Sequence, residues 1–405
     1  MRKFLLVISM LLCSVLAMPG QTLGYTVKGK VVDAESGKAL ESVHVRVPGR
    51  SQATVTNADG DFVLKSDRPV TELLFSYMGY RDRRQRIGEQ PELRVRLQRE
   101  NLQLSESSIV SGNPREIVLA ALDRIWDSYC TEPELLQCFY RETVQKRSRY
   151  TYVAEAVARL YKARDDGSVY RDAAAVEKSR VLVSQRKADT LSVKTMGGPT
   201  QALTMDLVKN QGVIFSPDEL ALYAFSMEQP AYIGDRLQFV IRMTPAQTVD
   251  YALYNCTLYI DRELLTFTRV EASLDMSDPA KATRMILVSK PLNLRFFPEE
   301  VAVVMNYNLL EDGHSQLSYF RSTIRFACDW RKRLFKTRYT TVNELVITDV
   351  FPEAVPIPRK EQFRLRDALN DKAPEFLDPD FWADYNIIEP SESLENAIGK
   401  LRKGK

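Results

Sequence analysis

Four acidic side chains gather near the C-terminus, next to aromatic residues. The acids are Asp378, Asp380, Asp384 and Glu389, and the aromatic neighbours are Phe381, Trp382 and Tyr385. A pair of carboxylates is enough for glycoside hydrolysis, and a larger cluster could bind a sugar or a calcium ion. The simpler interpretation, which we favour, is an acidic turn in which Phe381 and Trp382 hold the chain end against the protein.

Histidine, the side chain that most often serves as a general base or a zinc ligand, is scarce. The two histidines are His44, between two valines, and His314, which follows Gly313. We expect His44 to face solvent from a strand and His314 to lie in a turn. The sequence has no Gly-x-Ser-x-Gly, His-Glu-x-x-His, phosphate-loop or dinucleotide-binding motif. We therefore predict no catalytic residue, no metal site and no cofactor, and a protein that is not an enzyme.

Gly197-Gly198-Pro199 is a segment whose backbone N–H groups could cradle an anion. Such a triplet more often begins a helix, and we favour that interpretation. The expected short helix covers residues 202–209.

The first residues have the pattern of a secretion signal. Two basic residues precede the segment from Leu5 to Leu16, which is almost wholly apolar. A helix of this length reaches only about 18 Å, whereas the core of a bilayer is about 30 Å thick. We predict a signal peptide over residues 1–24, with cleavage after Ala17, Gly20 or Gly24. No later segment has the run of about 18 apolar residues that a spanning helix needs, so the mature chain is expected in the periplasm or at the periphery of the outer membrane.

Export leaves four cysteines in the mature chain, and an oxidising compartment permits disulfides. They are Cys130, Cys138, Cys256 and Cys328. Cys256 and Cys328 lie in strand-like segments, where they either pair across a sheet or fill the core as small apolar side chains. Cys13 precedes the cleavage sites, and the bulky Leu12 before it argues against a lipid anchor.

The charge of the chain is balanced. There are 56 basic and 53 acidic side chains, which give a formal net charge of +3. This balance creates no field that would favour nucleic-acid binding. Short basic runs at 81–86 and 331–333 are typical of strand edges that charges protect from aggregation. We expect other envelope proteins or outer-membrane components as partners.

Residues 25–98 have the pattern of a small β-sandwich. Val43, Val45 and Val47 alternate with polar residues, as do Leu93, Val95 and Leu97, and this period of two is typical of half-buried strands. Turn residues separate such segments every 8–12 residues or so. Gly37, Gly60 and Gly79 are expected at positive φ in these turns.

Four motifs in this part resemble the carboxypeptidase regulatory-like domain. They are Gly29–Leu40, Val43-His44-Val45, Thr54–Leu64 and Phe75-Ser76-Tyr77-Met78-Gly79-Tyr80. The resemblance implies a transthyretin-like β-sandwich without a peptidase site, of the kind that opens many Bacteroidetes envelope proteins.

A polar segment at 99–112 is predicted to be a linker, and a capped helix follows it. Asn113 and Pro114 have the order of an N-cap and a first helical residue. Ile117, Ala121 and Ile125, with Tyr129 beyond them, would form its buried face.

Residues 113–352 are predicted to form one curved antiparallel sheet, half-barrel-like, with short helices in its concave face. The expected strands cover 139–144, 150–161, 254–260, 265–274, 282–289, 301–309, 317–326 and 338–350. Short connections require antiparallel pairing. A further helix is expected from Ser216 to about Phe225. The fold class is therefore mainly β with some α.

The second part of the chain resembles the region that follows the regulatory-like domain in Bacteroidetes envelope proteins. The resemblance rests on Phe139–Thr143, Gly197–Pro199, Tyr259–Asp261 and Phe381–Pro390. Residues 353–405 are expected to form a C-terminal extension that ends in an amphipathic helix.

The favoured function is a non-catalytic scaffold or binding protein of the cell envelope. One alternative is a periplasmic carrier that holds a lipid or lipoprotein in the concave face of the sheet. The other is a hydrolase that uses the acidic residues near Asp378.

Overall fold

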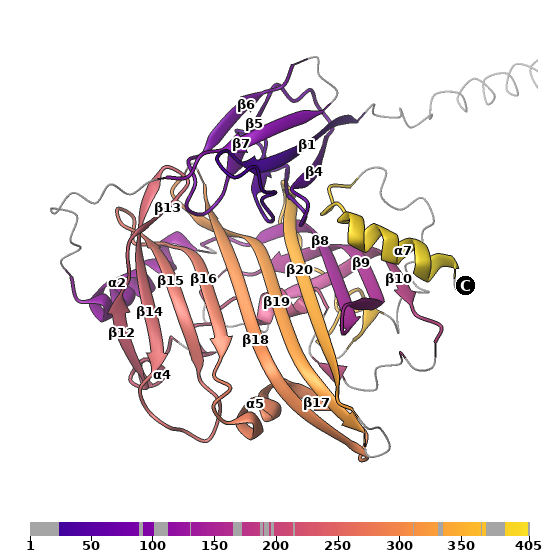
Figure 1. Ribbon diagram of the computed structural model, residues 1–405. Coiled ribbons are helices and arrows are strands. Elements are labelled where there is room, and N and C mark those ends of the chain that lie inside the picture. Colours follow the sequence, from indigo (N-terminus) through magenta and orange to yellow (C-terminus); the bar gives the residue numbers. More distant parts are fainter. Residues whose placement is uncertain are drawn as a thin grey trace, which may run out of the picture.

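The structure, a computed structural model, contains a small β-sandwich and a large antiparallel sheet (Figure 1). It describes residues 24–88, 92–100, 112–129, 131–164, 172–186, 189, 194–195, 198–213, 215–310, 312–330, 335–365, 367–369 and 385–403. The predicted signal peptide lies almost wholly outside these residues.

Seven strands form the sandwich, in two sheets of order β4-β1-β7 and β3-β2-β5-β6. They are β1 (Tyr25–Asp33), β2 (His44–Arg46), β3 (Ala53–Val55), β4 (Asp61–Ser66), β5 (Glu72–Ser76), β6 (Arg83–Arg86) and β7 (Leu93–Leu97). β1 pairs antiparallel with β4 and parallel with β7. Val45, Phe62, Phe75 and Val95 meet in its core. The sandwich predicted from the alternating pattern is confirmed.

The turns of the sandwich depend on glycine where it was expected. Gly37, Gly60 and Gly79 have φ angles of 69°, 79° and 77°. A Cβ atom at Gly60 would lie 2.4 Å from the carbonyl oxygen of Val31, so no other residue fits there without a shift of the backbone.

Basic residues protect one edge of the sandwich. Arg83, Arg84 and Arg86 of edge strand β6 are exposed, which confirms the prediction for this run. The run at 331–333 lies outside the described residues.

The first two residues of the predicted linker, Arg99 and Glu100, are held by the sandwich. Arg99 Nε donates to Asp33 Oδ2 at 2.8 Å, and the Tyr80 hydroxyl donates to the same oxygen at 2.6 Å. Glu100 forms an ion pair with Arg81. Only the part of the predicted linker at 101–111 lies outside the described residues.

The large sheet has eleven strands, and all of its pairings are antiparallel. The order is β10-β9-β8-β20-β19-β18-β16-β15-β14-β12, with β13 also paired to β14. The strands are β8 (Glu134–Lys146), β9 (Arg149–Lys162), β10 (Ala173–Val183), β12 (Tyr223–Met227), β13 (Ala231–Ile233), β14 (Arg236–Pro245), β15 (Tyr254–Asp261), β16 (Phe267–Leu274), β18 (Leu294–Leu309), β19 (Ser315–Trp330) and β20 (Thr337–Val350). The prediction of one large antiparallel sheet is confirmed.

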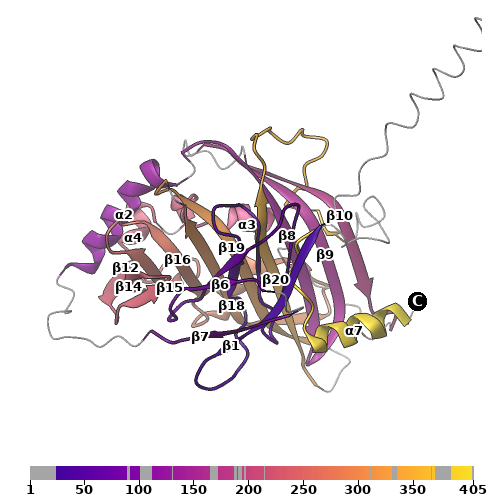
Figure 2. The same cartoon turned by 90° about the horizontal axis from the view of Figure 1, so that it is seen from above.

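Short helices pack against one face of this sheet, which we call the inner face (Figure 2). They are α2 (Pro114–Ser128), α3 (Thr200–Thr204) and α4 (Pro217–Leu220), and a 3-10 turn, η4 (Gln211–Val213), lies between α3 and α4 in the chain. The side chain of Asn113 caps α2, and Ala121 and Ile125 of that helix are buried as expected. Leu203 of α3 and Leu220 of α4 join the same apolar core as Phe320 and Leu345 of the sheet.

Three local predictions are wrong in their bounds or type. Residues 279–286 form a helix, α5 (Pro279–Ile286), rather than the start of a strand, because the Asp278 side chain accepts from two N–H groups of its first turn. Only β17 (Leu287–Ser289), which pairs with β11 (Lys194–Thr195), is extended there. The helix expected to reach Phe225 ends at Leu220, because the next residues pair with β14 as strand β12. The helix expected at 202–209 covers Thr200–Thr204.

The C-terminal extension packs along the sheet. Its last helix, α7 (Glu392–Lys403), buries Leu394, Ile398 and Leu401 against Val153 and Leu182, which confirms the predicted amphipathic helix. Within the described residues, no helix is long and apolar enough to cross a bilayer.

A buried ion pair links the helices of the inner face to the sheet. Lys162 of β9 and Asp206, just after α3, are both fully buried and paired with each other. The ammonium group also donates to the Tyr129 hydroxyl at 2.6 Å, and the Tyr307 hydroxyl donates to Asp206 Oδ1 at 2.9 Å. Loss of one partner would leave an uncompensated buried charge.

We expect Lys162→Met to lower the free energy of unfolding by about 3–5 kcal/mol. The double variant Lys162→Met with Asp206→Asn should recover much of this loss, because it removes the stranded charge and keeps a hydrogen-bonding group for each tyrosine: the amide oxygen accepts from one hydroxyl, and the amide nitrogen donates to the other. Urea unfolding followed by circular dichroism measures both, with the exposed Lys400→Met as control. A double variant as unstable as the single one would contradict the charge argument.

Candidate functional site

The sandwich covers part of the outer face of the large sheet, opposite the helices (Figures 1 and 2). Val55 of β3 packs with Phe139 of β8, Tyr319 of β19 and Val346 of β20. Ile387 and Ile388 of the C-terminal extension complete this cluster. Side chains of opposite pleat, such as Phe320 and Leu345, point to the inner core. The central strands are therefore buried on both faces.

Hydrogen bonds fix the position of the sandwich on the sheet. Thr54 Oγ1 donates to the Ile387 carbonyl oxygen at 2.9 Å, and Asn57 Nδ2 donates to that of Pro390 at 3.2 Å. On the other side, the Gly79 N–H donates to the carbonyl oxygen of Tyr232 in β13 at 2.9 Å. The sandwich is thus held at both sides of the contact.

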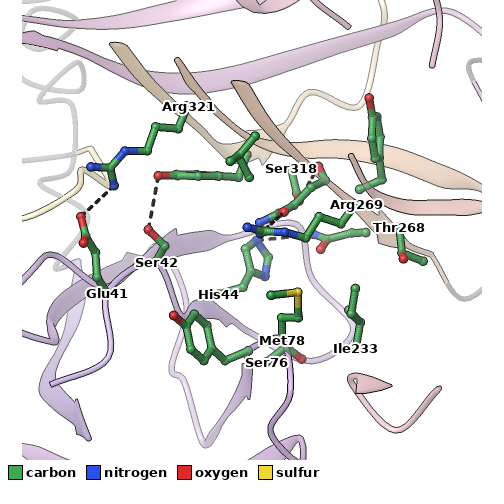
Figure 3. A pocket seen from close by; sticks show the side chains of 16 residues that line it. Glu41, Ser42, His44, Ser76, Met78, Ile233, Thr268, Arg269, Ser318 and Arg321 are labelled. Atoms are coloured by element: carbon green, nitrogen blue, oxygen red, sulfur yellow. Dashed lines mark hydrogen bonds and ion pairs between the residues drawn. The ribbon is translucent and has the colours of Figure 1, made fainter. Parts of the chain in front are cut away.

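A cavity of about 290 Å³ lies between the sandwich and the sheet. Figure 3 shows His44 of β2 beneath Arg269 of β16, with Met78 close by. We call this cavity the interdomain pocket. It is lined by Glu41, Ser42, His44, Ser76, Tyr77 and Met78 of the sandwich, and by Ile233, Thr268, Arg269, Val304, Asn306, Tyr307, Asn308, Ser318, Tyr319 and Arg321 of the sheet.

The charged groups of the interdomain pocket are paired. Arg269 Nε lies 2.7 Å from Glu271 Oε1, and Arg269 Nη1 donates to Asn306 Oδ1 at 2.8 Å. Arg321 Nη1 lies 2.8 Å from Glu41 Oε1 and 3.5 Å from Glu344 Oε1. The pocket therefore presents no isolated charge among its described residues.

His44 faces the sheet and is partly buried, so the prediction that it faces solvent is wrong. Its Nε2 lies 3.4 Å from Asn308 Nδ2. Burial lowers the pKa of His44 to about 4, and the nearby Arg46 adds to the shift. The imidazole is neutral at pH 7 and offers one donor and one acceptor.

Several hydroxyl groups of the pocket are hydrogen-bonded within the protein. Ser42 is hydrogen-bonded to the Tyr319 hydroxyl at 3.3 Å, and Ser318 Oγ donates to the Asn306 carbonyl oxygen at 3.1 Å. Burial raises the pKa of Tyr319, so its hydroxyl stays protonated. No serine among the described lining residues is hydrogen-bonded to His44, and the nucleophile–base pair of a hydrolase is not formed.

The acidic residues near the C-terminus are only partly described. Asp378, Asp380, Trp382 and Asp384 lie outside the described residues. Glu389 lies on the outer face beside Ile388, and burial raises its pKa. The ring of Tyr385 lies 5.4 Å from Lys178 Nζ. Ile387 and Ile388 pack this end of the chain against the sheet, whereas Phe381 and Trp382, the residues predicted to do so, lie outside the described residues.

The Gly-Gly-Pro segment forms a helix entrance, as favoured. Gly198 has a φ of 87°, and its N–H donates to the Tyr140 hydroxyl at 2.7 Å. This N–H is therefore occupied, and α3 begins two residues later. Gly197 lies outside the described residues.

Cys138, Cys256 and Cys328 are buried free thiols. The pairing of Cys256 with Cys328 is therefore wrong, and their interpretation as core side chains is confirmed. Burial raises the pKa of Cys256 to about 12 and that of Cys328 to about 11, which keeps both protonated. Cys130 lies outside the described residues. His314 lies in the β18–β19 turn, as predicted, next to Asp312. In the described part of the chain, no three His, Cys, Asp or Glu side chains are placed to hold a metal ion.

Sequence reasoning missed the residues that line the pocket from the sheet. Asn306 and Asn308 lie on the outer face of β18, while Met305 and Tyr307 are buried on the inner face. Asparagine is uncommon in strands. Two asparagines at alternate positions were therefore the sequence signal that this face of β18 is polar at this point.

Comparisons with known proteins identify the sandwich but not the large sheet. Residues 27–110 match the family model of the CarboxypepD_reg-like domain, in agreement with the motifs in the sequence. No curated protein matches the chain.

Three solved structures are similar at low scores. A domain described as an outer membrane lipoprotein-sorting protein from Vibrio parahaemolyticus has 11% identity and a TM-score of 0.26, and the match covers 59% of this chain and 91% of that one. A DUF1329 family protein from Desulfovibrio piger has 9% identity and a TM-score of 0.22, covering 58% and 92%. A chain of the MucA/MucB complex of Pseudomonas aeruginosa has 14% identity and a TM-score of 0.19, covering 60% and 100%. Scores this low establish no shared function.

Protonation of His44 should lower the stability of the protein. The unfolded chain takes up a proton at His44 near pH 6.5, whereas the folded chain does so only near pH 4. Stability from this group is therefore lost as the pH falls between these values. We expect the wild type to lose about 1–3 kcal/mol more than His44→Gln between about pH 7 and pH 4 in urea unfolding. Parallel stability curves for the two proteins would contradict a buried neutral His44.

Proposed function

We propose that this protein is an exported, non-catalytic binding protein of the cell envelope, and that the interdomain pocket holds its ligand. The apolar N-terminal segment supports export, to the periplasm or the periphery of the outer membrane. The pocket supports binding, because it combines polar groups from two parts of the chain that are held together. Envelope proteins or outer-membrane components are the partners that we expect to bind the protein surface around the pocket.

The observation that carries the proposal is the position of the pocket. The hydrogen bonds from Thr54 and Gly79 hold the sandwich on either side of the contact, so the cavity is preorganised. A preformed site binds without the cost of ordering loops. Its charged groups are engaged with each other, and its neutral histidine is not hydrogen-bonded to a serine.

The carrier alternative places an acyl chain in the concave face of the sheet. That face is occupied by the protein's own side chains, because Leu203, Phe215 and Leu220 are buried there against Phe267 and Phe320. A bound lipid would have to displace them. We therefore place the ligand on the outer face.

Native mass spectrometry of protein extracted gently from the envelope fraction tests the proposal. Met78 lines the pocket, and we expect Met78→Trp to fill it. The wild-type chain should carry a bound small molecule and lack its first 17–24 residues, and Met78→Trp should carry none.

Leu292→Trp is the matched control, because Leu292 is fully exposed and outside the pocket. This variant should keep the ligand. An intact N-terminus on cytosolic protein, or equal occupancy in wild type and Met78→Trp, would contradict the proposed function. A co-purified lipid that Met78→Trp does not displace would favour the carrier alternative.

A further inference from the structure

We propose that the interdomain pocket binds an uncharged, polyhydroxylated ligand, such as one neutral sugar unit of an envelope glycan. This inference rests on the proposed function and adds the chemical class of the ligand. It follows from the charges, hydrogen-bonding groups, apolar surface and size of the pocket.

The ion pairs of the pocket leave no excess charge for an ionic ligand. Arg269 is engaged by Glu271 and Asn306, and Arg321 by Glu41 and Glu344. An anion would have to compete with carboxylates that already hold both guanidinium groups. A cation would find Glu41 and Glu344 paired with Arg321, and Glu271 paired with Arg269. A neutral ligand does not have to compete with these ion pairs.

Neutral hydrogen-bonding groups remain available to a ligand. Asn306, Asn308 and Tyr77 line the pocket. Within the described residues, Arg269 occupies only the Oδ1 of Asn306, and His44 contacts only the Nδ2 of Asn308. His44 has only a long 3.4 Å contact to Asn308. Amide, imidazole and phenol groups both donate and accept, and a sugar hydroxyl does the same. A sugar carries several hydroxyl groups, so it can pair with more than one of these groups at once.

The apolar lining suits the C–H face of a sugar ring. Met78 and Ile233 lie in the pocket, and Tyr77 supplies an aromatic ring whose contact with Tyr80 (5.3 Å between centroids) holds it in place. A Tyr ring combines an apolar body, which can pack on the C–H face of a sugar, with a polar tip, which can hydrogen-bond to a sugar hydroxyl. The cavity of about 290 Å³ is at the lower end of the range for small-molecule sites, roughly 300–1,000 Å³, and limits the ligand to a small unit.

Saturation-transfer NMR and isothermal titration calorimetry on the mature chain test this inference. The neutral probes are glucose, N-acetylglucosamine and maltose, and the charged probes are glucuronate and glucosamine. We expect at least one neutral sugar to bind at millimolar concentration and more tightly than its charged counterpart. Asn308→Ala should weaken binding about tenfold, the loss expected for one or two hydrogen bonds.

Tyr77→Phe keeps the ring and should weaken binding less, while Asn255→Ala is the control on an exposed asparagine of the outer face outside the cavity. Preference for a charged probe, or no binding of any neutral sugar at concentrations on the order of 10 mM, would overturn the ligand class. So would equal binding by Asn308→Ala and Asn255→Ala. If native mass spectrometry still finds a molecule that Met78→Trp excludes, the pocket remains a binding site and only its ligand class is wrong.

Discussion

The central strands of the large sheet carry apolar side chains on both faces, so both faces must be covered. Helices α2, α3 and α4 cover the inner face, and the sandwich with Ile387 and Ile388 covers part of the outer one. Burial of a side chain the size of Phe139 or Val346 contributes roughly 1.5–3 kcal/mol each. Removal of the sandwich would return part of this surface to water. The two parts of the chain therefore depend on each other for their arrangement.

The interdomain pocket is a consequence of this docking. Where the outer face is apolar, at Phe139 and Val346, the sandwich packs against it directly. Where β18 presents Asn306 and Asn308 instead, His44 contacts Asn308 and a cavity remains beside this contact. The two asparagines are groups that a ligand in the cavity would meet. The pocket has its position because apolar contact fixes the sandwich beside it.

The sequence was informative about local structure and less so about contacts between distant parts. Alternating valines located the strands of the sandwich, and Gly60 marked a turn that admits no side chain. The cap at Asp278 was overlooked because the residues after it also fit a strand. The pocket could not be predicted, because it joins His44 to Asn308 across domains. A histidine between two buried valines faces the opposite side of its strand, but only the fold shows that another sheet lies there.

A distance measurement between the sandwich and the sheet tests the central claim most directly. Spin labels introduced at the exposed Arg86 of β6 and Asn255 of β15 report on the two parts without disturbing the cluster around Tyr319. Double electron–electron resonance should give one narrow distance distribution, and Val346→Asp, which places a charge in the contact, should broaden it. A broad distribution in the wild-type protein would contradict a fixed sandwich, and with it a preformed pocket.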